Sequence, residues 1–346
     1  MGALSTPLLV LVFVAGGAAT WAAGVFLSNT TDALDDRFGL GDAFGGLVLL
    51  AITGTLPEIA ITVSAARAGH LDLAVGDLIG GVAVQTLVLV ILDAVSGPER
   101  PLSYLVGSLL PVIEALIVIV VLGTALGGAA LSPSKNVFGA SPTSIAVVVL
   151  WLLGLWIVNR ARMHPEYHVE APPGATPGRR YRRQGDVHPY AGASKVRVLA
   201  IFLAAAVVTL VAGVALQASG SLLASRAHIG GAVFGATVLA VATSLPEISS
   251  GVRAVQLGDM QLAVSDIFGG NAFQITLLLV ADLIAGTPVI VAAHHSDVWL
   301  GAAGILMTGI AAMAIVARPQ RTYLWLGIDS LALIAVYAVA IALLPK

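Results

Sequence analysis

The sequence predicts an all-α membrane protein whose ten transmembrane helices form two inverted five-helix repeats. Three observations support this fold class: the apolar composition, a series of long uncharged runs, and an internal match between residues 40–97 and 229–286. Of the 346 residues, 58% are hydrophobic and only 10% are charged. Because about a quarter of the residues in an ordinary soluble domain are charged, this composition excludes most classes of soluble protein.

Hydrophobic segments locate the membrane spans, and long runs without a charged residue support them. Apolar segments of about 20 residues are long enough to cross the hydrocarbon core of a bilayer. Ten such segments are expected at 4–27, 43–68, 71–95, 102–122, 141–159, 196–218, 231–257, 261–285, 298–317 and 322–344. The first lacks a basic start and exceeds the length of a signal-peptide core, so we expect it to remain as a membrane helix.

A basic connector separates the two halves of the chain. Residues 160–197 contain eight of the seventeen lysines and arginines, interspersed with prolines and glycines. We therefore assign a first five-helix repeat to 1–160, a flexible linker to 161–194 and a second five-helix repeat to 195–346. Since basic loops stay in the cytoplasm, the linker is predicted to be cytoplasmic. Threading outward from it gives a multi-pass protein of the cell membrane with both termini outside.

The internal match is a repeat of helix pairs. Shifting residues 40–97 by 189 positions onto 229–286 gives a gap-free match with 23 identities in 58 positions. Matched helices lie five predicted spans apart, which is an odd number, so the two copies cross the membrane in opposite directions. Inverted repeats of this kind meet near the bilayer midplane, where secondary transporters bind their substrates.

Each repeat carries a proline followed by a glutamate in the middle of an apolar span. The two elements are Gly-Thr-Leu-Pro-Glu at 54–58 and Thr-Ser-Leu-Pro-Glu at 243–247. A proline inside a membrane helix removes a backbone donor and breaks or kinks the helix, so backbone oxygens are left unpaired near Glu58 and Glu247. Carboxylate, hydroxyl and carbonyl oxygens at one depth are the ligands that a hard cation prefers. We interpret the two breaks as halves of one cation site.

A second pair of matched elements follows the breaks, and in each an aspartate, a glycine and a glutamine share one helical stripe. These residues are Asp77, Gly81 and Gln85 in the first repeat and Asp266, Gly270 and Gln274 in the second. We expect the glutamines to offer amide oxygens to the glutamates, the alternative being plain hydrogen bonds between helices. The aspartates either bind the cation, line its path, or cap a helix near the membrane boundary. Asp93 and Asp282 also match and are expected at the interface.

These paired motifs, with a Gly/Ser-Asp-x-x-Gly-Gly helix after each break, resemble the two alpha repeats of the cation/calcium exchanger superfamily over about a third of the chain. The resemblance implies an alternating-access antiporter in which Glu58 and Glu247 bind Ca2+ or the exchanged cation. It also implies further ligands at positions that match those of the family. These are the hydroxyls of Thr55, Thr243 and Ser244 and the backbone carbonyls of Ala51 and Ala240.

The motifs depart from the sodium-coupled branch of that superfamily. Gly54 stands in place of a threonine, Gly81 and Gly270 in place of serines, and the two glutamines in place of Asn or Asp. The lost hydroxyls leave fewer oxygens for separate Na+ sites, whereas glutamine resembles the proton-coupled branch. Independently of family, two glutamates neutralise one divalent ion, and with two glutamine oxygens they approach the roughly 6 to 8 ligands of Ca2+. An empty pair of carboxylates in a low dielectric should also take up a proton readily.

We therefore expect a secondary antiporter, and not an enzyme, that exchanges Ca2+ or a similar cation for H+ or Na+ with Glu58 and Glu247 as shared ligands. A monovalent Na+/H+ antiporter is the alternative within this class. A cation channel, which needs a continuous selective pore, is the alternative outside it. With a net charge of −2 and no cysteine, the expected partners are the transported cations and the lipid bilayer, without nucleic acid or a resident cofactor. The roles of Glu114 and Asp329, the ions and the oligomeric state stay open.

Overall fold

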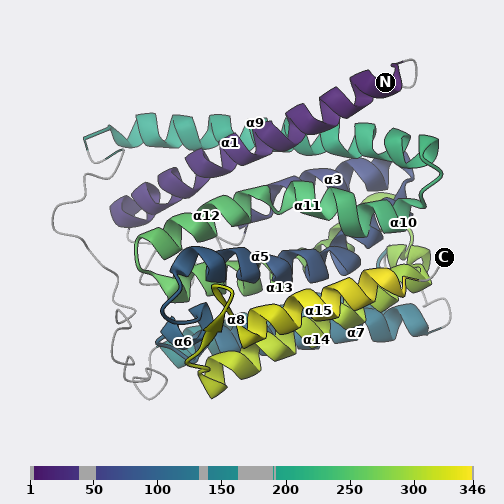
Figure 1. The fold of residues 1–346 in the computed structure, drawn as a ribbon. Helices are drawn as coiled ribbons and strands as arrows, with labels where there is room; N and C mark the ends of the chain where they lie inside the picture. Colours follow the sequence, from purple (N-terminus) through teal and green to yellow (C-terminus); the bar gives the residue numbers. More distant parts are fainter. Residues whose placement is uncertain (1–3, 39–51, 132–138, 163–189, 191, 345–346) are drawn as a thin grey trace.

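The computed structural model describes residues 4–38, 52–131, 139–162, 190 and 192–344, and most of them are helical (Figure 1). The first half of the chain contains α1 (Thr6–Phe38), α3 (Leu56–Ala68), α4 (Leu71–Val75), the π-helix η2 (Gly76–Gly80), α5 (Gly81–Ser96), α6 (Leu102–Leu105), α7 (Leu110–Ala130) and α8 (Pro142–Arg162). The second half contains α9 (Lys195–Arg226), α10 (Gly231–Phe234), the π-helix η4 (Gly235–Leu239), α11 (Ala240–Thr243), α12 (Leu245–Gln256), α13 (Met260–Ala285), the 3-10 helix η5 (Val289–Ala292), α14 (His295–Ala317), β1 (Thr322–Tyr323), β2 (Leu326–Gly327) and α15 (Ile328–Ala342).

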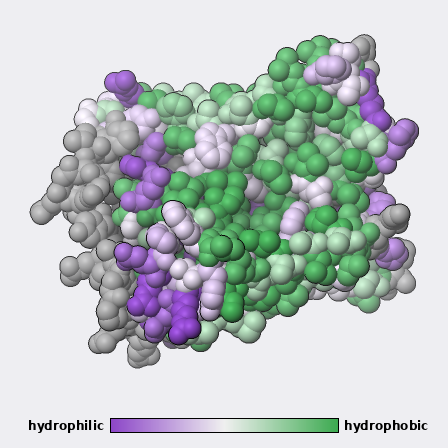
Figure 2. Space-filling view, in the orientation of Figure 1, coloured by the Kyte–Doolittle hydropathy of each residue, from purple (hydrophilic) through white to green (hydrophobic). Residues whose placement is uncertain are grey.

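The helices form a multi-pass integral membrane protein. Seven spans within the described residues are long and apolar enough to cross a membrane: α1, the continuous α4–η2–α5, α7, α8, α9, α13 and α14. Figure 2 shows a broad hydrophobic band across the middle of the molecule, with hydrophilic residues gathered toward its two ends. Large apolar side chains such as Leu11 of α1 and Val211 of α9 are exposed, as expected where lipid tails replace water.

Three further segments complete the predicted ten-helix plan: α3, the continuous α10–η4–α11–α12, and α15. Each corresponds to a predicted span, so the all-helical membrane fold is confirmed. Residues 43–51 of the second predicted span lie outside the described residues, as does most of the predicted linker at 161–194.

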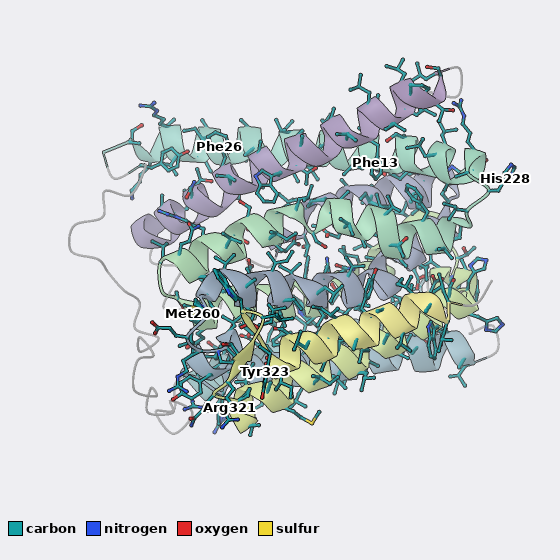
Figure 3. The ribbon with its side chains drawn as sticks, in the orientation of Figure 1. Phe13, Phe26, His228, Met260, Arg321 and Tyr323 are labelled. Atoms are coloured by element: carbon teal, nitrogen blue, oxygen red, sulfur yellow. The ribbon has the colours of Figure 1, made fainter. Side chains whose placement is uncertain are left out.

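Two predicted spans begin six to eight residues too early. The fourth span, predicted at 102–122, begins at Leu110, because Leu102–Leu105 forms the separate helix α6 and Pro111 occupies the first turn of α7, where proline is favoured. The tenth, predicted at 322–344, begins at Ile328, since Thr322 and Tyr323 pair with Gly327 and Leu326 in a β-hairpin. Arg321 and Tyr323 mark this hairpin in Figure 3.

The helices are arranged in three layers. On one face α1 and α9 cross and contact each other extensively (Figure 1). The middle layer contains α3, α5, α12 and α13, which carry the paired motifs, and α7, α8, α14 and α15 cover the opposite face. A large apolar cluster that includes Leu78, Val82, Ile267 and Ile275 joins the middle and third layers. The functional motifs are thereby held between two layers of packed helices.

The outer helices cross over between the two halves of the chain. α1 contacts α12, and α9 contacts α3, so each outer helix lies on the Pro-Glu helix of the other half. The ring of Phe13 on α1, which Figure 3 labels, also meets the ring of Phe234 on α10 edge to face, with centroids 5.8 Å apart.

Asp93, near the end of α5, joins this helix to the last helix of the chain. Its carboxylate is buried, and Oδ2 accepts hydrogen bonds from Gly327 N at 2.7 Å and Ser330 Oγ at 2.6 Å, at the start of α15. Oδ1 accepts from Leu102 N at 2.6 Å in the connection that follows α5.

Asp282, near the end of α13, makes the mirrored connection. Its Oδ2 accepts from Ser141 N and Ser144 Oγ at the start of α8, both at 2.7 Å, and Oδ1 accepts from Val289 N at 2.6 Å. Both aspartates lie near the ends of their helices and are buried in the protein. Each therefore fastens a motif-bearing helix of one half to a peripheral helix of the other half.

Candidate cation site

The Pro-Glu elements form helix starts inside the membrane layer. Thr55 and Ser244 are the residues at which the backbone turns, and Pro57 and Pro246 occupy the first turn of the helices that follow. Proline fits this position because the first-turn N–H groups have no intrahelical partner. The glutamate after each proline also lies in the first turn, where the helix dipole favours a negative charge. The break therefore positions each carboxylate at a helix N-terminus.

Glu58 and Glu247 meet in the interior, as the repeat predicts. Their exposed fractions are 0% and 4%, and their carboxylates are close enough to interact electrostatically. Oε1 of Glu58 accepts a hydrogen bond from Gln85 Nε2 at 3.2 Å, and the Thr243 hydroxyl faces the same carboxylate. Oε2 of Glu58 and both oxygens of Glu247 are buried without a hydrogen-bond partner in the described part of the chain. Buried carboxylate oxygens in this state need a proton or a cation.

The matched aspartates lie near this pair and do not cap helices. Asp77 is in η2, is 1% exposed, and neither of its carboxylate oxygens has a hydrogen-bond partner among the described residues. Its carboxylate lies close enough to interact electrostatically with both Glu58 and Glu247. Asp266 is in the interior of α13, and its carboxylate lies close enough to Glu247 to interact with it electrostatically. It accepts a hydrogen bond from Ser250 Oγ at 2.6 Å. Four carboxylates thus share one buried region, which is electrostatically costly unless cations or protons neutralise it.

The two glutamines differ from the expectation and from each other. Gln85 presents its amide nitrogen, not its oxygen, to Glu58. Nε2 of Gln274 donates instead to the backbone oxygens of Asp77 at 2.9 Å and Leu78 at 3.0 Å. The amide oxygens of both glutamines are buried without hydrogen-bond partners among the described residues. These two oxygens are available to a cation.

The three predicted hydroxyl ligands are buried beside the breaks. Thr243 Oγ1 and Ser244 Oγ donate to the Ala240 carbonyl at 3.1 and 2.7 Å, and Thr55 Oγ1 donates to Ile52 O at 3.5 Å. A hydroxyl that donates its proton keeps its lone pairs for a cation. The Ala240 carbonyl, itself a predicted ligand, already accepts hydrogen bonds from the hydroxyls of Thr243 and Ser244. Ala51 lies outside the described residues.

The described residues contain no group of three His, Cys, Asp or Glu side chains already placed to hold a metal ion. A cation in this region therefore needs hydroxyl, amide and backbone oxygens as well as carboxylates, or a closer approach of the acidic side chains. Mixed oxygen ligands in a flexible arrangement are usual for Ca2+.

A polar contact between the two halves was not foreseen from the motifs. Asn271 Nδ2 donates to Thr86 Oγ1 at 3.5 Å, and both side chains are buried. Thr86 directly follows Gln85, and Asn271 is one helical turn before Gln274. Neither residue has a polar counterpart in the other repeat, because Asn271 matches Val82 and Thr86 matches Ile275. The only available signal was a polar residue within an apolar helix, which membrane proteins use between helices.

Two glycines bring the outer helices against the breaks. A Cβ on Gly24 of α1 would lie 2.8 Å from Cβ of Pro246, and a Cβ on Gly213 of α9 would lie 2.6 Å from Cβ of Ala60 and 3.0 Å from the Pro57 oxygen. The two glycines are 189 positions apart, the same offset as the internal repeat. The inverted symmetry therefore extends to the contacts that cover the site, each made by the helix of the opposite half.

Comparisons with known proteins agree with this architecture. A family model described as "Sodium/calcium exchanger protein" matches residues 8–161 and 197–344. The chain is 28% identical over 242 residues to the inner membrane protein YrbG of Escherichia coli (strain K12). This match covers 70% of this chain and 69% of YrbG.

Two solved exchangers have a similar fold. The sodium-calcium exchanger NCX_Mj matches with a TM-score of 0.62 and 17% identity, covering 99% of this chain and 100% of that chain. The H+/Ca2+ exchanger CAX matches with a TM-score of 0.69 and 13% identity, covering 98% of this chain and 82% of that chain. These identities are low, so the likeness concerns the fold. The family model, by contrast, spans both Pro-Glu helices and nearly the whole sequence, and on that basis the chain belongs to the sodium/calcium exchanger protein family.

Proposed function

We propose that this protein is a secondary antiporter that exchanges Ca2+ or a similar divalent cation for H+, with Na+ as the alternative counter-ion. One observation carries the proposal: Glu58 and Glu247 converge from two mirrored helix starts and leave three carboxylate oxygens buried without hydrogen-bond partners in the described part of the chain. Ionisable groups at this depth serve transport far more often than structure.

The donor set supports a divalent cation. Two carboxylates neutralise a charge of two, and the remaining oxygens come from hydroxyl, amide and backbone groups, which are usual Ca2+ ligands. We assign the binding role to Glu58 and Glu247 with the nearby oxygens of both halves. The proposed contributors are the side chains of Thr55, Thr243, Ser244, Gln85, Gln274, Asp77 and Asp266 and the backbone carbonyls of Ala51 and Ala240.

Protons are the favoured counter-ion because the chain has few hydroxyls where a sodium site would need them. The glycines that replace serines border the site: a Cβ on Gly81 would lie 3.4 Å from Gln274 Nε2, and one on Gly270 would lie 3.9 Å from Cγ2 of Thr55. A serine at either position would add an oxygen near these groups. Glycine lacks this oxygen, so fewer ligands remain for separate Na+ ions.

Coupling would follow from exclusive occupancy of the carboxylates. Either the divalent cation or the counter-ions neutralise Glu58 and Glu247, and only a neutralised site allows the two halves to change the side they face. We further propose that residues 1–160 and 195–346 act as the two repeats, joined by a cytoplasmic linker at 161–194, with both termini outside the cell membrane.

The test is isotope exchange by purified protein in vesicles. Radioactive Ca2+ uptake driven by a pH gradient is compared between the wild type, E58Q, E247Q and the control E99Q, which changes an exposed glutamate. Both site variants should lose uptake by at least about tenfold, since even the outer-shell partners of metal ligands are worth 10- to 100-fold, and the control should not. Full exchange in both site variants would refute the assignment.

Two controls separate the alternatives. Exchange of Na+ for H+ with Ca2+ absent would favour the monovalent antiporter. A flux without a fixed exchange ratio would favour a channel, because a pore does not couple the two flows.

A further inference from the structure

The two repeats differ in this structure at positions that match in the sequence. Residues Gly76–Gly80 form the π-helix η2, whereas the matched residues 265–269 lie within α13, which is α-helical from Met260 to Ala285 without interruption. The two stretches share the pattern Asp-x-x-Gly-Gly and differ at residues 76, 78 and 79, where the second repeat has Ser265, Ile267 and Phe268. Their contacts differ as well.

Gln274 contacts the widened stretch. A π-helical turn disturbs the regular backbone ladder and presents carbonyls to a side chain that inserts there. Nε2 of Gln274 donates to the oxygens of Asp77 and Leu78, both within η2, at 2.9 and 3.0 Å. The amide orientation is fixed, because a carbonyl oxygen only accepts hydrogen bonds. Gln274 of the second half thus stabilises the π-helix of the first half.

Gln85, the residue that matches Gln274, donates to a glutamate and not to the facing helix. Its Nε2 donates to Glu58 Oε1 at 3.2 Å, within its own half. Glu247, the matched glutamate, has no hydrogen-bond partner on either oxygen among the described residues. In this structure, therefore, one glutamine restrains its own glutamate while the other restrains the facing helix.

We propose that Gln85 and Gln274 are positioning residues that exchange these two roles each time the exchanger changes the side it faces. The proposal rests on alternating access by the two inverted repeats, in which the conformation of one repeat in one state becomes that of the other repeat in the opposite state. In the opposite state Gln274 donates to Glu247, and Gln85 donates to the backbone oxygens of Asp266 and Ile267. The π-helix then lies at 265–269, and 76–80 returns to α-helix.

The packing around η2 is consistent with a segment held by specific contacts. A Cβ on Gly80 would lie 2.3 Å from Cβ of Ala236 in η4, and a Cβ on Gly235 would lie 2.6 Å from Leu73 O and 3.0 Å from Asp77 N. Glycine at these positions lets the two π-helices touch. Gly80 has a matched glycine, Gly269, and a Cβ built there meets no described atom within 4 Å in this structure.

The exchange of partners gives each glutamate a distinct role in each state. The glutamate that its glutamine restrains is fixed, and the other is open to a cation or a proton. In this state Gln85 holds Glu58 by a hydrogen bond, and in the opposite state Gln274 holds Glu247. One of the two glutamates is therefore free of a glutamine hydrogen bond in each state.

The test compares Q85L, Q274L and the double variant by sided thiol labelling, which is clean because the chain contains no cysteine. Reporter cysteines are placed singly at Ser64 on α3 and Ser249 on α12, both half-buried near the two breaks, and labelled with an impermeant maleimide from either face of the membrane. Loss of the Gln274 bonds should shift the ratio of the two facing states about tenfold. Q85L should shift it in the opposite direction, because by the exchange of roles it removes one hydrogen bond from this state and two backbone hydrogen bonds from the opposite state. The double variant should return toward the wild type.

A plain ligand role predicts a different pattern. Shifts in the same direction for Q85L and Q274L, or no shift in either, would overturn the proposal. If a leucine variant does not fold, Q85M or Q274M removes the same donor from an unbranched side chain. Thiol labelling does not depend on which ion is carried, so failure here is distinguishable from failure of the Ca2+ assignment.

Discussion

Ser330 Oγ donates a 2.6 Å hydrogen bond to Oδ2 of Asp93, which ties the last helix of the chain to the helix that carries Gln85. The matched bond from Ser144 to Asp282 ties α8 to the helix that carries Gln274. Each of these two helices is therefore fastened near its C-terminal end to a helix of the other half, which holds Gln85 and Gln274 in a common frame.

Replacing Asp93 tests this frame. In D93N the amide nitrogen cannot accept, so one of the buried donors loses its acceptor at a cost of about 1–3 kcal/mol. S330A removes one donor and should cost about 1 kcal/mol. We expect the melting temperature to fall more in D93N than in S330A, and the same order for D282N and S144A. Equal stability of D93N and the exposed control S225A would contradict the account.

Alanine at Gly24 or Gly213 tests the contacts of the outer helices. The added methyl group would meet Pro246 or the Ala60–Pro57 turn at 3.0 Å or less, and such overpacking costs about 1–3 kcal/mol. We expect both variants to lower the exchange rate, measured by isotope uptake at equal protein amount. G127A is the matched control, because a Cβ there meets no described atom within 4 Å. Wild-type rates in both site variants would show that close contact at the breaks is unnecessary.

The pH dependence of Ca2+ uptake tests competition at the carboxylates. If protons and Ca2+ compete for Glu58 and Glu247, raising the pH on the Ca2+ side removes the competitor. The Ca2+ concentration for half-maximal uptake should then fall by up to about tenfold per pH unit for each competing proton. A half-saturating concentration that stays constant between pH 6 and pH 8 would be incompatible with shared ligands.

Serine at Gly270 tests whether a missing hydroxyl oxygen weakens Na+ binding. The nearest atom to a Cβ there is Cγ2 of Thr55 at 3.9 Å, so the side chain fits, whereas a Cβ on Gly81 would lie 3.3 Å from Cβ of Ala240. G270S adds a hydroxyl oxygen beside the site without strain. We expect Na+ to inhibit Ca2+ uptake more strongly in G270S than in the wild type, measured at constant ionic strength. Unchanged Na+ sensitivity would mean that this oxygen is not what limits Na+ binding.

The fold was largely predictable because its determinants are periodic and long. The offset of 189 positions and the apolar runs identify the spans, and the Pro-Glu elements identify where helices begin inside the membrane layer. Apolar composition could not reveal that α7 begins only at Leu110 or that a hairpin precedes Ile328. In both places apolar residues form a turn, and a hydropathy window cannot distinguish a turn from a span.

The site was predictable only as far as symmetry holds. The convergence of Glu58 and Glu247 follows from inverted repeats, and it is observed. The partners of Gln85 and Gln274 could not be predicted, because the two glutamines match in the repeat but donate to different groups. Asn271 and Thr86 were missed for the converse reason, since neither has a polar residue at its matched position. The sequence does not determine how the two repeats differ in structure, because the same sequence can adopt more than one conformational state.

The most direct test of shared ligands is the number of protons released when Ca2+ binds to the purified protein. Calorimetric titration in buffers of different ionisation enthalpy measures this number without a membrane or a gradient. We predict that the wild type releases protons on binding Ca2+ and that E58Q and E247Q each release fewer and bind more weakly. Tight Ca2+ binding with no proton release, unaffected by either substitution, would contradict the account.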